Sequence, residues 1–159
     1  MPKIQNQKSS ELNIEFFENT RMSIIDPLGI YISNDVKWIE LNEKWNSSKF
    51  PVVVGGKGQP VLLLHGFDSS FLEFRRIYPL LKNNFQVIIP DLLGFGFSPR
   101  CACNQYTPSK IISHLIDIIK NLKITKKLKI IGASMGGSTA IKLSNEIPEF
   151  VEKLILLSP

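Results

Sequence analysis

The stretch KLKIIGASMGGSTAIKL, residues 127–143, joins an apolar run to a segment with helical spacing. At the join, Gly132, Ser134 and Gly136 fit the pattern G-x-S-x-G. This pattern is typical of a sharp strand-to-helix turn that lifts a serine hydroxyl above a parallel sheet. Side chains at the two glycines would collide as the strand and the helix close on each other. The stretch therefore predicts a strand over 128–134, a helix that follows it, and a candidate nucleophile at Ser134.

The rest of the chain alternates in the same way. Continuous apolar runs predict strands buried on both faces, as parallel sheets require, at 60–66, 85–92, 128–134 and 151–159. Between them, apolar residues at helical spacing predict helices at 71–81, 108–123 and 136–147. A capping box of Ser70 and Glu73 opens the first helix, and Thr107 caps the second ahead of Pro108. Residues 38–42 and 50–60 read as a preceding hairpin. The fold class expected is α/β, with a doubly wound, mostly parallel sheet.

Two further motifs stand at the carboxyl ends of predicted strands, where α/β folds place their sites. His65, Gly66 and Phe67 end the first buried strand, and DLLGFGFS (91–98) ends the second. The amide of Phe67 is expected to join that of Met135 in an oxyanion hole beside Ser134. The alternative for the elbow is a serine that merely caps a helix beside closely packed glycines. The three motifs in order favour the catalytic interpretation.

With these motifs, residues 36–159 resemble the N-terminal half of an α/β-hydrolase-fold protein, and residues 1–35 are expected to be an N-terminal extension. The segment from Gly132 to Pro159 is similar to the elbow region of esterases, perhydrolases and carbon–carbon bond hydrolases, although FDSSFLEF after Gly66 departs from the glycine-rich pattern of the last group. The resemblance implies a serine hydrolase of esters or related acyl substrates, with no cofactor and no metal. It makes Ser134 the nucleophile, and it implies that His65 braces the oxyanion loop and that Asp91 shapes the loop after its strand.

The order of the triad in this fold is serine, then acid, then histidine. Both histidines of the chain, His65 and His114, precede Ser134, and no histidine follows it. A serine without a base is a weak nucleophile at neutral pH. We therefore expect an incomplete hydrolase, ending after its sixth strand and inactive as an isolated chain. The alternative is a catalytically inactive fragment or a binding protein that retains the elbow.

Composition narrows the remaining classes. Hydrophobic residues make up 43% and charged residues 21% of the 159, which indicates a globular domain rather than a disordered chain. The apolar runs are too short to span a bilayer, and the polar N-terminus has no secretory h-region, so a cytoplasmic location is expected. The net charge of +5 owes much to lysines within 120–129, but no aromatic residues interleave them, so no nucleic-acid partner is expected. Cys101 and Cys103 are too few for a structural zinc site.

The last predicted strand, at 154–158, carries apolar side chains and no lysine or proline within the run. The resemblance implies the strand order 1-2-4-3-5-6, in which this sixth strand is left as a sheet edge and is therefore a template for strand pairing. The expected partner at this edge is therefore either a complementing C-terminal chain or a second copy of this one. A small-molecule substrate is the partner that the hydrolase resemblance implies.

Overall fold

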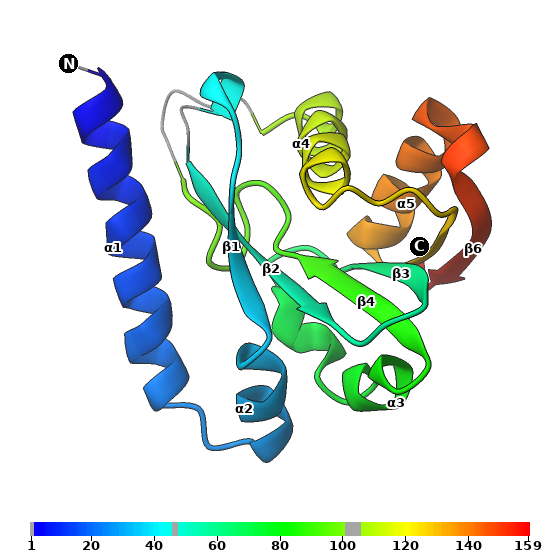
Figure 1. Ribbon diagram of the computed structural model, residues 1–159, viewed down its shortest axis with the longest axis horizontal. Coiled ribbons are helices and arrows are strands. Elements are labelled where there is room, and N and C mark those ends of the chain that lie inside the picture. Colours follow the sequence, from blue (N-terminus) through cyan, green and yellow to red (C-terminus); the bar gives the residue numbers. More distant parts are fainter. Residues whose placement is uncertain (1, 46–47, 101–105) are drawn as a thin grey trace.

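The computed structural model describes residues 2–45, 48–100 and 106–159, and its centre is one six-stranded sheet (Figure 1). The strands lie in the order β1-β2-β4-β3-β5-β6, as expected for the family. Antiparallel pairing joins β1 to β2 and β2 to β4, whereas β4, β3, β5 and β6 run parallel. The strands are β1 (Val36–Glu40), β2 (Lys49–Gly55), β3 (Gln59–Leu64), β4 (Phe85–Pro90), β5 (Leu128–Ala133) and β6 (Val151–Leu157). The expected doubly wound, mostly parallel sheet is confirmed.

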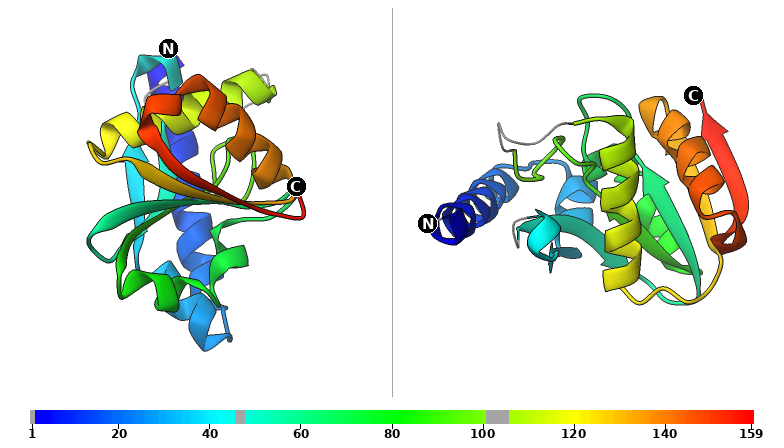
Figure 2. Two further views of the ribbon diagram at one scale, coloured as in Figure 1. Left: turned by 90° about the vertical axis from the view of Figure 1, so that its right-hand side faces the viewer. Right: turned by 90° about the horizontal axis from the view of Figure 1, so that it is seen from above.

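Helices cover both faces of this sheet (Figure 2). The α-helices are α1 (Pro2–Met22), α2 (Pro27–Ser33), α3 (Tyr78–Lys82), α4 (Pro108–Asn121) and α5 (Met135–Glu146). Short 3-10 helices are η1 (Glu43–Trp45), η2 (Phe71–Phe74) and η3 (Pro148–Phe150). Side chains of α4 and α5 pack on one face, and side chains of α1, α2, η2 and α3 on the other.

The two faces divide the apolar side chains of each strand between them. On β3, Leu62 and Leu64 belong to the core under α4 and α5, whereas Val61 and Leu63 belong to the opposite core. This alternation follows from the two-residue period of a strand. Because both faces are covered, all four side chains are at most 3% exposed, which explains why the run is apolar without a break.

The prediction of one continuous helix over 71–81 is wrong, because the structure has two shorter helices there, η2 and α3. Pro79 explains the interruption, since proline has no N–H and its ring clashes with the carbonyl four residues earlier in a continuing helix. Of the two hydrogen bonds that the predicted capping box requires, the structure has only the one that Ser70 accepts. Ser70 Oγ accepts the N–H of Leu72 as a cap should, but the carboxylate of Glu73 does not return to Ser70. The cap of α4 is as expected, with Thr107 Oγ1 accepting the N–H of Lys110.

Residues 2–33 contain α1 and α2, which lie beside β1 at the end of the molecule opposite to β6 (Figures 1 and 2). Phe17 anchors α1 and is 2% exposed. Its ring makes edge contacts with Trp38, Phe71 and Phe97, at centroid distances of 5.9, 6.2 and 5.1 Å. Aromatic pairs at such distances contribute beyond the area they bury. The N-terminal helices therefore pack on the loops that follow β3 and β4, and they leave the β6 edge uncovered.

Strand β6 pairs only with β5 among the described elements. The prediction that this last strand is buried on both faces is wrong, because none of its residues is buried and Ile155, Leu156 and Leu157 are exposed. None of the described helices is both long enough and apolar enough to cross a bilayer.

Candidate active site

Ser134 lies at the junction between β5 and α5. Its backbone has φ 50° and ψ −121°, a conformation that non-glycine residues rarely adopt. A Cβ at Gly132 would overlap the backbone of Gly136, and a Cβ at Gly136 would overlap the carbonyl oxygen of Leu64. The glycines are therefore required for the close approach of strand and helix that the sequence predicted. The serine side chain is exposed, and its hydroxyl has no hydrogen-bond partner among the described residues.

Two backbone amides next to Ser134 are free to stabilise a negative charge. The loop after β3, residues 65–70, which we call the oxyanion loop after its expected role, approaches the serine so closely that a Cβ on Gly66 would lie 3.4 Å from the Cβ of Ser134. Within the described part of the chain, neither the N–H of Phe67 nor that of Met135 has an acceptor. The N–H of Met135 also opens α5, where the helix dipole favours an anion. Two unpaired N–H donors, one on the loop after β3 and one at the start of α5, are the groups that an oxyanion hole needs.

His65 is fully buried and holds the oxyanion loop to the loop after β4. Its Nε2 accepts the N–H of Leu92 at 3.0 Å, and its Nδ1 lies 2.8 Å from the carbonyl oxygen of Gly66. Because a carbonyl can only accept, this pairing assigns the proton to Nδ1 and leaves the ring neutral. Burial lowers the pKa of His65, which is consistent with the neutral form. Both nitrogens are engaged, so the ring has no lone pair with which to accept the proton of Ser134.

Glu73 is a second brace that the sequence interpretation missed. Its Oε2 accepts the N–H of Gly66 at 2.8 Å, so a carboxylate takes the amide next to that of Phe67. This contact occupies the Gly66 amide, whereas the neighbouring Phe67 amide has no acceptor in the described part of the chain. This role of Glu73 had no separate signal in the sequence, because Glu73 also satisfied the spacing of a capping box.

Asp91 is fully buried and accepts hydrogen bonds from backbone amides in the segments that follow β3 and β4. Its Oδ1 accepts the N–H of Phe71 at 2.6 Å and its Oδ2 that of Phe97 at 2.7 Å. Burial raises the pKa of Asp91 to about 7, although the two amides and Arg100 favour the ionised form. No contact joins Asp91 to Ser134, so the structure places this acid as a support of the loops.

An apolar cavity of about 400 Å³ adjoins the elbow. Phe67 and Met135, which carry the two free amides, line it, and it extends between α4 and α5. Its lining consists of Phe67, Phe95, Tyr106, Pro108, Ile111, Ile112, Met135, Ser138, Thr139 and Lys142. Phe67 is 72% exposed and its ring stands 5.5 Å from that of Phe95, so an aromatic pair forms one wall. Of the cavities in the described part of the chain, we take this one as the candidate substrate site because Met135, the residue after Ser134, lines it together with Phe67.

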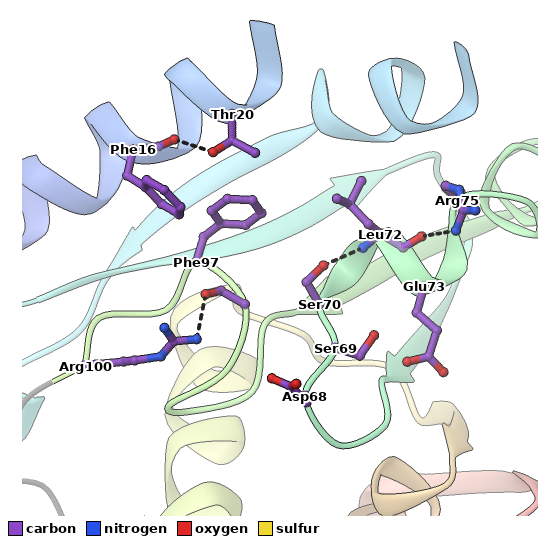
Figure 3. A pocket seen from close by; sticks show the side chains of 11 residues that line it. Phe16, Thr20, Asp68, Ser69, Ser70, Leu72, Glu73, Arg75, Phe97 and Arg100 are labelled. Carbon is purple, nitrogen blue, oxygen red and sulfur yellow. Dashed lines mark hydrogen bonds between the residues drawn. The ribbon is translucent and has the colours of Figure 1, made fainter. Parts of the chain in front are cut away.

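A larger cavity, of about 690 Å³, lies on another side of the oxyanion loop, between that loop and α1 (Figure 3). Its lining includes Asp68, Ser69 and Glu73 but neither Ser134 nor Met135. Its two arginines already have partners. Arg75 is paired with Asp26 at 2.6 Å, and Arg100 donates to the carbonyl oxygens of the loop after β4.

His114, the other histidine, lies on α4 and is also fully buried. It packs edge-on against Trp45 and Phe50, at centroid distances of 5.1 and 4.3 Å. Neither ring nitrogen has a hydrogen-bond partner among the described residues. Burial lowers the pKa of His114 to about 3. The side chain therefore fills the core under η1, and no described histidine is positioned as a base for Ser134.

A metal centre has no candidate ligands in the described ranges, where no three histidine, cysteine or acidic side chains gather. The pair Cys101 and Cys103 lies outside the described residues.

Comparisons with known proteins agree with this geometry. A family model described as the alpha/beta hydrolase fold matches residues 59–159. A curated relative, 2-hydroxy-6-oxo-6-(2'-aminophenyl)hexa-2,4-dienoic acid hydrolase from Metapseudomonas resinovorans, is 39% identical over 105 residues, which cover 64% of this chain. The solved structure of a meta-cleavage product hydrolase from Pseudomonas fluorescens IP01 is 31% identical, with a TM-score of 0.67 over 74% of this chain. A marine microorganism esterase is also 31% identical, with a TM-score of 0.63 over 67% of this chain.

The chain spans only part of these proteins. It covers 36% of the Metapseudomonas enzyme, 43% of the Pseudomonas structure and 40% of the esterase.

Proposed function

The chain belongs to the alpha/beta hydrolase fold family, and from that membership we propose that Ser134 is the nucleophile of a serine hydrolase acting on an ester or related acyl substrate. One observation carries the proposal. A strained, exposed serine hydroxyl stands beside two backbone amides without acceptors, those of Phe67 and Met135. Strain of this kind is retained in proteins mainly where the site uses it.

The reaction follows from these groups. Ser134 Oγ attacks the carbonyl carbon, and its proton passes to a base. The carbonyl oxygen becomes an oxyanion held by the amides of Phe67 and Met135. When the tetrahedral intermediate collapses, the bond from carbon to the alcohol oxygen breaks, and the alcohol leaves with the proton from the base. Water then cleaves the acyl-enzyme by the same steps in reverse, which releases the acid and restores Ser134.

We propose that the base comes from outside residues 1–159. Both histidines of the chain are committed elsewhere, since His65 braces two loops and His114 lies in the core. Of the described elements, β6 is the natural place for a complementing chain to join. Its outer edge is unpaired in the described sheet, and Ile155 and Leu156 are exposed on it.

A fluorophosphonate carrying a simple alkyl group tests the nucleophile. Its phosphorus takes the place of the carbonyl carbon, so a bond to Ser134 Oγ forms as fluoride leaves. We expect slow labelling of the chain alone, and clear acceleration by added imidazole, which supplies the missing base. Mass spectrometry should find the adduct on Ser134 and lose it in Ser134→Ala.

Ser144→Ala is the matched control, because Ser144 is on the same helix and its hydroxyl already donates to the carbonyl oxygen of Ala140. Labelling that survives in Ser134→Ala, or none even with imidazole, would contradict the proposal. The second result would favour the other candidate function, a binding protein that retains the elbow. The observation in its favour is that the Ser134 hydroxyl has no partner in the described structure.

Sedimentation of the chain alone tests the β6 edge. We expect self-association at micromolar concentration that Leu156→Lys reduces, because a charge on an edge strand opposes pairing with another chain. A monomer at all concentrations, unchanged by the substitution, would count against a docking role for β6.

A further inference from the structure

The cavity beside Ser134 is apolar over most of its length but has a polar end on α5. Phe67, Phe95 and Met135 wall the part next to the elbow, and Ser138 and Lys142 belong to the polar part. Lys142 is half-buried, yet its Nζ has no carboxylate or hydrogen-bond acceptor in the described part of the chain. The hydroxyl of Ser138 is likewise without a described partner. A half-buried ammonium group that lines an apolar cleft and has no partner there can pair with an anion that a ligand brings.

The spacing of these residues sets the length of such a ligand. Ser138 and Lys142 are four residues apart and share one face of α5, which begins at Met135, directly after Ser134. Seven residues of helix separate Met135 from Lys142, or about 10 Å along the axis. Helical side chains lean toward the N-terminus, so the lysine reaches back toward Ser138 and shortens this span. An arm of roughly six to nine bonds then joins the elbow to the ammonium group.

We propose that the cleft selects substrates whose apolar arm ends in an anionic group, of which a carboxylate is the simplest. The arm lies between the ring pair of Phe67 and Phe95 and the first turn of α4, and the anion pairs with Lys142 and accepts the hydroxyl of Ser138. Lys142 is thus a specificity residue for the reaction proposed at Ser134. The inference rests on that proposed function for the meaning of the site, but the binding it describes does not require a reactive serine.

Two unreactive ligands of equal size test the proposal, 6-phenylhexanoate and its neutral amide, 6-phenylhexanamide. Calorimetry gives the two affinities, and shifts of amide resonances in ¹H–¹⁵N NMR spectra show whether the ligands contact the cavity, at Ile112 and Met135, or the exposed β6. The variants are Lys142→Met, which keeps the length and removes the charge, and Lys142→Arg, which keeps the charge. Lys120→Met is the control, because Lys120 is an exposed lysine at the far end of α4.

We expect the unsubstituted chain and Lys120→Met to bind the carboxylate about tenfold more tightly than the amide, as a charge-assisted hydrogen bond would give. The preference should fall below about twofold in Lys142→Met and return in Lys142→Arg. An equal preference in Lys142→Met, shifts confined to β6, or no binding of either ligand would overturn the proposal. Ser134→Ala should keep the preference. A chain that prefers the carboxylate but resists fluorophosphonate labelling would therefore refute the proposed nucleophile alone, and the reverse result would refute only the role of Lys142.

Discussion

The surroundings of His65 and of His114 differ although both rings are fully buried. His65 stands at the carboxyl end of β3, and each of its nitrogens has a backbone partner. His114 lies under η1 between two aromatic rings, with neither nitrogen paired among the described residues. Burial lowers the pKa of both. The difference shows that a buried, perturbed histidine is not by itself a functional group, because its hydrogen-bond partners decide whether it organises a site or only fills space.

The largest effect is expected from His65→Phe. The substitution keeps a ring but leaves the N–H of Leu92 and the carbonyl of Gly66 buried without partners. Each such group costs about 1 to 3 kcal/mol, so the free energy of unfolding in urea should fall by about 2 to 6 kcal/mol. Phe67→Ala is the neighbouring control, because that side chain is mostly exposed and should cost far less. A loss below about 1 kcal/mol for His65→Phe would make the two histidines equivalent.

A fall in pH should act through His114. Its pKa is about 3 in the folded chain and near 6.5 when unfolded, so below pH 6.5 only the unfolded chain gains the proton. This contribution to stability is therefore present above pH 6.5 and lost as the pH falls toward 3. At pH 5 the loss is about 2 kcal/mol. Urea unfolding at pH 7.5 and pH 5 should show that His114→Leu loses less stability than the unsubstituted chain, by this amount. Parallel losses in both chains would mean that His114 is protonated in the folded state.

At pH 7.5 the same substitution should stabilise the chain. His114→Leu replaces an unpaired polar ring by an apolar side chain of similar size, among Trp45 and Phe50. We expect a gain of about 1 kcal/mol in the free energy of unfolding, since a buried polar group without a partner costs about that much or more. If His114→Leu were destabilising by 1 kcal/mol or more, the ring would have an interaction that the comparison with His65 does not include.

The smallest effect is expected at Glu73, the second brace of the oxyanion loop. Glu73→Gln keeps an oxygen that accepts the N–H of Gly66 but removes the charge. Because a charge-assisted hydrogen bond is only moderately stronger than a neutral one, the loss should be about 0.5 kcal/mol at neutral pH. Fluorophosphonate labelling of Ser134 should change by less than about threefold. A tenfold drop in labelling without a change in stability would show that the charge itself, rather than the contact, positions the loop.

Most of the fold could be predicted from the spacing of apolar residues and from local steric limits. The apolar runs on β3, β4 and β5 can be buried on both faces only within a covered parallel sheet, and the family resemblance implied the strand order. The turn at Ser134 was readable for a local reason, because Gly132 and Gly136 are needed wherever a strand and a helix approach so closely. Pro79 was a sequence indication of the break between η2 and α3, because proline interrupts a helix. The apolar spacing of the segment nevertheless favoured one continuous helix.

Local sequence patterns were thus enough to predict the layers of this protein and the position of its elbow, since both depend on residues close together in the chain. Which distant groups meet became known only from the folded structure. Glu73 binds Gly66 rather than its own helix, Asp91 accepts amides from two loops, and Phe17 packs against the rings beyond them. The partners of a buried polar group depend on which loops converge around it, and residue spacing does not encode that convergence. For the same reason, residue spacing did not distinguish the roles of the two histidines: His65 holds two loops together, whereas His114 packs in the core.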